Sequence, residues 1–432
     1  MTATPLAGAE ADALLAPLDR FSRLALAVSG GPDSLALLHL AAAWLRRHAS
    51  GDVFVLTVDH GLRPQSRDEA EMVGRVARSL GLPHAILPWR HGAIHAGVQA
   101  RARRARYDLM AAYCTAHGIP ALVTAHHLDD QAETFLMRLK RGSGLDGLAA
   151  IPEHGTWAGM TLLRPLLDVS KARLIATVEA AGLAYITDPS NADTRFERGR
   201  LREAAAELAR LGLTAEAIAR SARRLRRARS ALEAAADRFL AEHGERSAAG
   251  FASVSCAALR AGPQEVSLRA LARLIATVGG TAEPVRLVKL EALYAALSAD
   301  PGKGHTLGGC QIVPSQDRLF VFREVRKTGL HELELHPGER MLWDNRFRLE
   351  LGKTESEPVT VRALGEDGVQ ALTTCDGFLQ AWPRLAARAL PSCWRAGGLL
   401  CLPEFGQDAR SSDAPLSRHE GALDCRATFL WG

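Results

Sequence analysis

The sequence has few cysteines, and their spacing excludes the sites that cysteine-rich proteins build. The chain holds seven cysteines, an odd number, and no two of them form a CxxC pair. This pattern argues against a structural zinc, an iron–sulfur cluster and a disulfide framework. We therefore expect reduced thiols and a cytoplasmic location. The cysteines are Cys114, Cys256, Cys310, Cys375, Cys393, Cys401 and Cys425.

Long hydrophobic runs are also lacking. No stretch reaches the roughly 18 consecutive apolar residues that a membrane-spanning helix needs, so no membrane partner is expected. The N-terminal segment MTATPLAGAEADALLAPLDR is acidic before its first basic residue, which does not fit a signal or transit peptide. A net charge of +5 is modest for a nucleic-acid-binding protein, so the distribution of charge is more informative than its sum.

The order of apolar and amphipathic segments predicts an α/β protein with further parts after it. A chain of 432 residues is too long for one compact core. Strand-length apolar runs alternate with helical ones as far as about residue 190, which predicts a Rossmann-like parallel sheet with helices on both faces. The expected strands are Leu24–Val28, Val53–Val58, His84–Leu87 and Ala121–Ala125, and the expected helices include Arg67–Leu80 and Ala100–His117. We expect a nucleotide-binding catalytic domain at 1–200, a mainly helical domain at 201–329 and a β-rich domain at 330–432.

A glycine turn, SGGPDS, stands between the first expected strand and the next helix. Glycines let a backbone approach a ligand closely, and the free N–H groups of a helix N-terminus attract phosphate oxygens. The turn is neither a GxxxxGK[ST] loop nor a GxGxxG loop, and an ordinary structural turn is the alternative. As a phosphate loop it comprises Ser29, Gly30, Gly31, Pro32, Asp33 and Ser34.

Two other expected strands end in polar residues, and in parallel sheets ligands bind at these ends. Asp59 follows one strand and suits a ribose hydroxyl or a base amine, although capping of the next helix is an equal alternative. The run AHHLDDQAET follows another strand and lacks the HxxxH or HExxH spacing of a metal site. In this run Asp129 or Asp130 is a candidate helix cap, with Glu133 completing a capping box. Alternatively, Asp130 and Glu133 lie on one face of a helix and bind an ammonium group.

Basic residues gather in two places. The run QARARRARY puts Arg103 and Arg106 near one face of a helix, with a solvated basic surface as the alternative. Between Arg195 and Arg229 there are eleven arginines, no lysine and four glutamates. Such clustering is typical of a surface that contacts nucleic-acid phosphates.

Taken in order, seven short motifs resemble those of the bacterial tRNA(Ile)-lysidine synthases, which are PP-loop ATP pyrophosphatases. The motifs are SGGPDS, DHGLR, ARRARY, AHHLDDQAET, RGSGLDGL, RPLL and DPSN, and the resemblance covers residues 21 to about 202. The resemblance implies an enzyme that joins L-lysine to C2 of the wobble cytidine in a CAU-anticodon isoleucine tRNA. It implies that ATP first adenylates the cytidine, that AMP and pyrophosphate are released, and that codon specificity changes from AUG to AUA.

The resemblance also implies cofactors and residue roles. ATP is bound by the loop together with Asp59, and a Mg²⁺ ion acts with Asp33 on the pyrophosphate. Asp130 and Glu133 hold the lysine ammonium group, and a carboxylate, His126 or His127 accepts the proton that is lost on attack. The implied catalytic residues are Asp33, Asp130, Glu133 and His127, and the implied tRNA-binding residues are Arg103, Arg106, Arg198, Arg223 and Arg226.

The chain departs from the family pattern at two positions. Gln99 stands where the family usually has Glu, and Gly199 stands where it has Asn, which leaves the role of Arg198 less well defined than that of the loop. A tRNA thiolase of the same superfamily would need paired cysteines, a non-catalytic tRNA-binding protein would not need the intact motifs, and a small-molecule amidating synthetase would leave the arginine cluster unexplained. The sequence decides neither the Mg²⁺ ligands nor the oligomeric state, for which a homodimer is one option.

Overall fold

The computed structural model describes residues 3–48, 51–92, 97–187, 194–195, 197–281, 284–326, 329–372, 382–396, 398–405 and 424–430. The chain divides into two compact units, Met1–Arg229 and Ser230–Gly432. The first unit holds the sheet and the motifs named above. The expected domain boundaries near residues 200 and 330 stay a prediction.

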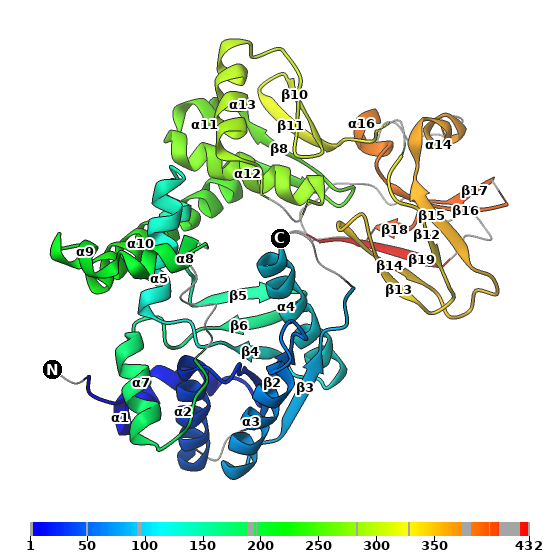
Figure 1. Ribbon diagram of the computed structural model, residues 1–432. Helices are drawn as coiled ribbons and strands as arrows, with labels where there is room; N and C mark the ends of the chain where they lie inside the picture. Colours follow the sequence, from blue (N-terminus) through cyan, green and yellow to red (C-terminus); the bar gives the residue numbers. More distant parts are fainter. Residues whose placement is uncertain are drawn as a thin grey trace. The chain divides into compact units, whose positions relative to one another are not determined.

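The first unit is built on a mostly parallel sheet in the strand order β3-β2-β1-β4-β6-β5 (Figure 1). All neighbours pair in parallel except β5, which is antiparallel to β6. The predicted Rossmann-like α/β fold and its four expected strands are therefore confirmed. The strands are β1 (Arg23–Ala27), β2 (Asp52–Asp59), β3 (His84–Pro88), β4 (Ala121–Val123), β5 (His154–Trp157) and β6 (Met160–Leu163).

Helices cover both faces of this sheet because successive side chains of a strand point to opposite sides. In β1, Leu24 and Leu26 pack into one core with residues of α2, α3 and α7, whereas Ala25 packs into another core with Tyr107 and Met110 of α4. The helices of the unit are α1 (Gly8–Leu15), α2 (Pro32–His48), α3 (Ser66–Ser79), α4 (Val98–Ala116), α5 (Leu128–Lys140), α6 (Leu145–Leu148), α7 (Lys171–Ala180), α8 (Glu197–Glu203) and α9 (Ala205–Arg210), with a short 3-10 turn at Ala16–Leu18. Helix α10 (Ala215–His243) spans the boundary between the units.

The β5–β6 hairpin was not anticipated from the sequence. Its turn residues Ala158 and Gly159 both have positive φ, +46° and +80°. This is the backbone of a tight two-residue hairpin turn, but the usual sequence signal for such a turn is Asn-Gly or Asp-Gly. The Ala-Gly pair therefore does not predict a hairpin, and the two short strands beside it could not be predicted from the turn.

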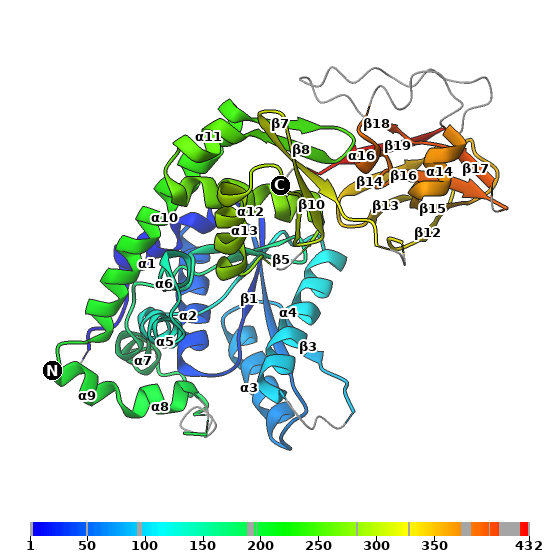
Figure 2. The same cartoon turned by 90° about the horizontal axis from the view of Figure 1, so that it is seen from above.

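The first sheet of the second unit is antiparallel, in the order β7-β8-β11-β10-β9. Figure 2 labels β7, β8 and β10 of this sheet. The expected helices of this region are accompanied by two short strands, β7 (Gly244–Ser247) and β8 (Phe251–Ser255), and β8 is stabilised by pairing with β11, far along the chain. The other elements here are α11 (Cys256–Ala261), α12 (Gln264–Gly279), α13 (Leu287–Ala299), β9 (His305–Leu307), β10 (Cys310–Ser315) and β11 (Arg318–Arg323).

Two four-stranded sheets, β12-β15-β16-β17 and β13-β14-β19-β18, complete the second unit and confirm the β-rich C-terminal part. Their inner residues form a shared core that includes Trp343 and Phe347. The elements are β12 (Leu333–Leu335), β13 (Arg340–Trp343), β14 (Phe347–Leu351), β15 (Val359–Ala363), α14 (Gly365–Leu372), α16 (Arg384–Ala387), β16 (Pro391–Arg395), β17 (Gly398–Cys401), β18 (Glu404–Phe405) and β19 (Cys425–Phe429).

The absence of disulfides and of a membrane span can be examined in the part of the chain that the structure describes. There, every cysteine is a free thiol, and Cys114 lies inside α4 as expected. None of the described helices combines the length and apolar character needed to cross a membrane.

Candidate active site

The site is formed where two neighbouring parallel strands end. Strands β1 and β4 pair side by side, with Leu26 opposite Val123, while β2 and β3 extend the sheet away from β1 on its other edge. The strand order thus reverses direction between β1 and β4, and such a switch point opens a crevice at the carboxyl ends of the strands. The glycine loop follows β1, and the two adjacent histidines follow β4.

The glycine loop is held by Ser34, the third residue of α2. Its hydroxyl accepts a hydrogen bond from the Ser29 amide at 3.1 Å and donates one to the Gly31 carbonyl at 3.0 Å. The two serine hydroxyls lie 3.3 Å apart. The loop is therefore closed on itself before any ligand binds.

The two glycines of the loop have different reasons to be glycine. Gly30 has a φ of +86°, and a Cβ there would lie 2.6 Å from the Ile186 side chain. The backbone amide of Ile186 donates to the Gly30 carbonyl at 2.9 Å. At Gly31 a Cβ would meet nothing nearer than the Ser29 hydroxyl at 3.8 Å. Gly30 is thus required by the fold, whereas Gly31 leaves open space over the helix N-terminus, as a phosphate-binding loop needs.

His127 lies among three carboxylates. Its Nε2 is 3.4 Å from Asp33 Oδ2 and 3.5 Å from Asp130 Oδ2, and its Nδ1 is 3.5 Å from Asp129 Oδ2. Burial acts to lower the pKa of His127, but the three carboxylates outweigh it and raise the pKa to about 10. The residue is therefore an imidazolium at neutral pH, which disfavours it as a proton acceptor.

The helix-capping alternatives are resolved by the hydrogen bonds of Asp129 and Asp130. Asp130 accepts from the backbone amide of His127 at 3.1 Å, which places His127 at the N-cap of α5. Asp129 accepts from the amide of Lys171 at 2.8 Å, at the start of α7. Both acids therefore have a structural function, while Glu133 takes no part in the expected capping box.

Asp33 contacts His127 through its Oδ2, and its other carboxylate oxygen is unused. Its Oδ1 is fully buried and has no hydrogen-bond partner among the described residues. In the described ranges, no group of three or more His, Cys, Asp or Glu side chains has an arrangement that could hold a metal ion by itself. An anionic oxygen of this kind fits a Mg²⁺ ion that is held by one or two carboxylates together with ligand phosphates, which is how Mg²⁺ is usually bound beside nucleotides.

Glu133 is buried and already holds two arginines of α8. Its Oε1 lies 2.6 Å from Arg202 Nε, and its Oε2 lies 3.6 Å from Arg198 Nε. Burial lowers the pKa of Arg202, but pairing with Glu133 reverses this and raises the pKa above its ordinary value. Arg198, expected to contact tRNA, thus lies next to the carboxylate expected to bind lysine.

His126 has the opposite electrostatic environment to its neighbour. Burial and the nearby charges of Arg103, Arg164 and Arg198 lower its pKa to about 3, although Asp130 acts in the other direction. Its Nδ1 lies 2.8 Å from the Thr124 hydroxyl. His126 is therefore the neutral histidine of the pair.

Asp59 is hydrogen-bonded locally but does not cap the next helix, whose N-cap is Gln65 without a side-chain cap hydrogen bond, so the capping alternative is wrong. Its Oδ1 accepts from the Ser66 hydroxyl at 2.5 Å and from the Gly61 amide at 3.0 Å, so it ties the end of β2 to the start of α3. The bond from Ser66 lowers the pKa of Asp59, burial opposes this, and the Gly61 amide lowers it further. The structure leaves its expected contact with the nucleotide a proposal.

The predicted tRNA-binding arginines differ in their surroundings. Arg103 is exposed and lies over the Tyr107 ring at 5.2 Å, whereas Arg106 is partly buried. Arg223 is half-exposed and 3.6 Å from Asp168. Arg226 is mostly buried, pairing with Glu153 at 3.0 Å and donating to a backbone carbonyl. The DPSN motif lies outside the described residues.

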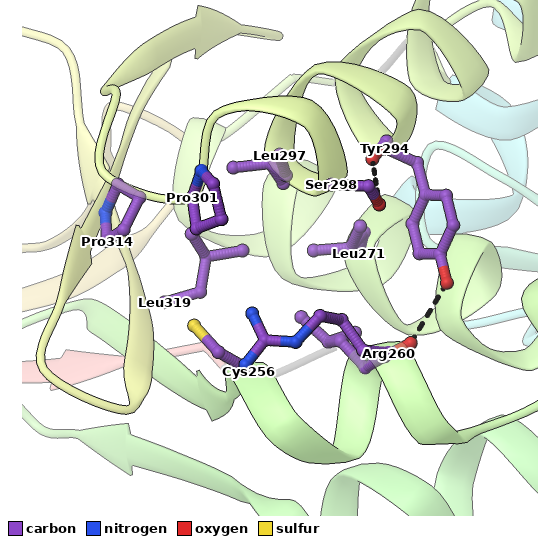
Figure 3. Close-up of a pocket in the computed structure, with 10 residues that line it drawn as sticks. Cys256, Arg260, Leu271, Tyr294, Leu297, Ser298, Pro301, Pro314 and Leu319 are labelled. Atoms are coloured by element: carbon purple, nitrogen blue, oxygen red, sulfur yellow. Dashed lines mark hydrogen bonds between the residues drawn. The ribbon is translucent and has the colours of Figure 1, made fainter.

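Two cavities among the described residues are lined neither by the glycine loop nor by the carboxylates around His127. In the second unit, a cavity of about 30 Å³ is lined by Cys256, Leu271 and Leu319, with Tyr294 at its edge (Figure 3). The Tyr294 hydroxyl donates to the Leu259 carbonyl at 3.0 Å. The cavity has room for about one water molecule and none for a nucleotide. In the first unit, a groove of about 350 Å³ lies between α5, α8 and α9.

The loop, the strand order and the acidic crevice together define an ATP-binding domain of the PP-loop class. A family model described as a PP-loop domain matches residues 6–208. The tRNA(Ile)-lysidine synthase of Methylobacterium nodulans is 49% identical over 308 residues, which cover 69% of this chain and 89% of that protein. Its counterpart in Rhodopseudomonas palustris is 44% identical, covering 72% of this chain and 93% of that protein.

A third relative extends the similarity further along the chain. The tRNA(Ile)-lysidine synthase of Ruegeria pomeroyi is 37% identical over 388 residues, which cover 89% of each protein. The chain belongs to the tRNA(Ile)-lysidine synthase family. The family suggested by the seven motifs is therefore confirmed.

Proposed function

We propose that this chain ligates L-lysine to C2 of the wobble cytidine in a CAU-anticodon isoleucine tRNA, consuming ATP and releasing AMP and pyrophosphate. The observation that carries the proposal is the meeting of an open glycine loop with Asp33 and Asp130 on either side of His127, and with Glu133 close by through Arg202, in a member of this family. The loop suits a triphosphate, and the carboxylates suit an ammonium group. The product would pair with A in place of G and so read AUA instead of AUG.

In the first step the cytidine O2 attacks the α-phosphorus of ATP, and the α–β phosphoanhydride bond breaks. The free amides at the start of α2 and the imidazolium of His127 are placed to stabilise the charge that develops on the phosphate oxygens. Asp33, with its unused Oδ1, would hold a Mg²⁺ ion, which when bound offsets the charge of the leaving pyrophosphate.

In the second step the lysine amine attacks C2, and the C2–O bond to the adenylate breaks. Asp130 and Glu133 hold the ammonium end of lysine, so the incoming cation must share Glu133 with Arg202 or displace it. Because His127 is already protonated, we assign the proton acceptor to a carboxylate or to His126.

The tRNA is held through its phosphates. Arg103 and Arg223 are the accessible members of the predicted set, which makes them the better candidates for backbone contacts. Arg226 is bound internally to Glu153, so its contribution to tRNA binding would be to position α10.

The experiment that tests the proposal is the transfer of labelled L-lysine to an unmodified CAU-anticodon isoleucine tRNA transcript, with and without ATP. The control is the elongator methionine tRNA, which has the same anticodon. We expect ATP-dependent label on the isoleucine tRNA alone. Formation of AMP without transfer of label would keep the adenylation step and refute lysine as the nucleophile.

A further inference from the structure

Three cysteine thiols lie together in the core that the two four-stranded sheets of the second unit share. Cys393 is on β16, Cys401 is on β17 and Cys425 is on β19. Cys393 and Cys425 are fully buried in this core, whereas Cys401 is partly exposed and packs against it. One sheet therefore contributes two thiols and the other sheet contributes the third.

The pairing of β16 with β17 places the first two cysteines opposite each other. Cys393 pairs with Cys401 and Trp394 pairs with Leu399, so β17 has one extra residue, Leu400, between the two pairs. Without this β-bulge, Leu400 would stand opposite Cys393. Instead, the Leu400 side chain is 44% exposed, and Cys401 packs against the core. The bulge thus gives up the burial of a leucine and brings a second thiol to Cys393.

The spacing of directly opposite residues suits a disulfide. The Cα atoms of antiparallel partners lie about 4.5–5.5 Å apart, and those of disulfide-bonded cysteines lie about 4.4–6.8 Å apart. The Cys393 thiol is already hydrogen-bonded to the thiols of Cys401 and Cys425, and these bonds, together with burial, raise the pKa of Cys393 above its ordinary value. Cys393 therefore stays protonated as a donor, and a sulfur that accepts its hydrogen bond is stabilised as a thiolate.

Packing alone does not account for this cluster. A single buried cysteine is usually an inert, small apolar side chain. Here, Cys401 lies on β17, the edge strand of its sheet, and is partly open to solvent, while Cys393 supplies the second thiol that a reversible oxidation needs. Because no three His, Cys, Asp or Glu side chains in the described part of the chain are arranged to hold a metal ion, the cluster suits thiol–disulfide chemistry.

We propose that Cys401 and Cys393 form a reversible thiol–disulfide site that responds to hydrogen peroxide. The Cys401 thiolate attacks one peroxide oxygen and the O–O bond breaks. Cys401 becomes a sulfenic acid, and the other oxygen takes up the proton that the thiol released and leaves as water. The Cys393 thiol then attacks the Cys401 sulfur. The S–S bond forms, the S–O bond breaks, and the hydroxyl group leaves as water with the Cys393 proton.

The product ties the edge strand β17 covalently to β16. A dithiol reverses the reaction by attacking the disulfide, and in a reducing compartment such a bond is transient. The site lies in the second unit and does not depend on the proposed function.

The test is peptide mapping of the full chain after treatment with hydrogen peroxide, with the remaining thiols blocked by iodoacetamide before digestion. Trypsin cleaves at arginines that separate the three cysteines into different peptides. We expect the peptides of Cys393 and Cys401 to appear joined, at their summed mass less two hydrogen atoms, and to separate after dithiothreitol. The three peptides are 389–395, 396–410 and 419–426.

Two variants separate the roles of the two thiols. In Cys393→Ala, the sulfenic acid of Cys401 has no thiol to attack it from β16, so its labelling by dimedone should rise several-fold over the wild-type chain. In Cys401→Ser, the linked peptide should disappear and Cys393 should stay reduced. The matched control is Cys256, which is also partly exposed but packs against a different core. Its dimedone labelling should be the same in the wild-type chain and in Cys393→Ala.

Three results would overturn the proposal. One is oxidation of the wild-type chain with no peptide linked through Cys393. Another is a link between the peptides of Cys393 and Cys425, which would leave Cys401 without a function. The third is equal labelling of Cys401 in the wild-type chain and in Cys393→Ala. The wild-type map requires no variant, so the test remains decisive if Cys393→Ala does not fold. Lysine transfer is assayed separately, so failure of this site is distinguishable from failure of the proposed function.

Discussion

Substitution of Glu133 distinguishes a structural function of this residue from a function in binding the substrate. Its carboxylate is buried and pairs with Arg202 at 2.6 Å, so Glu133→Gln leaves a guanidinium without its counter-charge. Breaking a fully buried pair costs about 3–5 kcal/mol. The Arg202 side chain is 31% exposed, so solvent screens part of the charge that remains. We therefore expect a loss of about 1–3 kcal/mol in the free energy of unfolding.

The same substitution should also change the lysine requirement. If Glu133 binds the ammonium group, its loss raises the KM for lysine by about tenfold to a hundredfold, while ATP affinity is kept because the glycine loop is untouched. The assays are thermal unfolding, lysine-dependent transfer to tRNA and ATP binding. We expect the Tm of the first unit, Met1–Arg229, to fall by roughly 5 °C. For a unit of this length, a loss of 1 kcal/mol lowers the Tm by about 2–4 °C.

The matched variant is Arg202→Gln, alone and combined with Glu133→Gln. If Glu133 binds lysine, Arg202→Gln removes a competing cation and leaves the KM for lysine unchanged or lower. If Glu133 serves only to hold Arg202, both single variants change the KM alike, and the double variant adds nothing. A Glu133→Gln protein with a lowered Tm and a normal KM for lysine would refute the ammonium assignment.

Three further predictions follow from the geometry. Gly30→Ala should lower the free energy of unfolding by about 1–3 kcal/mol, because Gly30 has a positive φ and the Ile186 side chain lies close to it. Gly31→Ala should keep a normal thermal transition and lose ATP affinity. Equal losses of stability in the two variants would contradict this. For His127, whose pKa is raised to about 10, the stabilisation is complete below pH 6.5 and is lost as the pH rises through 10; His127→Gln should flatten that part of the curve of unfolding free energy against pH, and an unchanged curve would refute the assignment. Arg223→Ala should weaken tRNA binding with a smaller salt dependence and keep the Tm, whereas Arg226→Ala should lower the Tm; the reverse pattern would show that the two roles are exchanged.

Local pattern was enough to predict the nucleotide-binding part of the site. The run from Leu24 to Leu40 alternates from strand to glycine turn to helix, and each of these elements is stabilised mainly by neighbours in sequence and by burial of its apolar face. The strand ends at Asp59 and His126 could be placed at one edge of the sheet because parallel strands share a direction.

The partners of the charged residues could not be predicted in this way. Arg202 lies 69 positions from Glu133, and Lys171 lies 42 positions from Asp129, so no sequence spacing indicates either contact. The hairpin that carries Trp157 was also missed, because its Ala-Gly turn lacks the usual signal and its short strands depend on pairing with each other and with β4.

The sequence by itself therefore determined the fold class, the phosphate loop and the family, since each depends on short contiguous motifs whose order is specific. Only the tertiary structure decided which ionisable groups are charged and which are already paired. His126 and His127 are adjacent in sequence, yet one is neutral and the other is an imidazolium. The reason is physical: a pKa depends on burial and on the charges within a few ångströms, and these charges come from arginines and aspartates on separate elements of the fold.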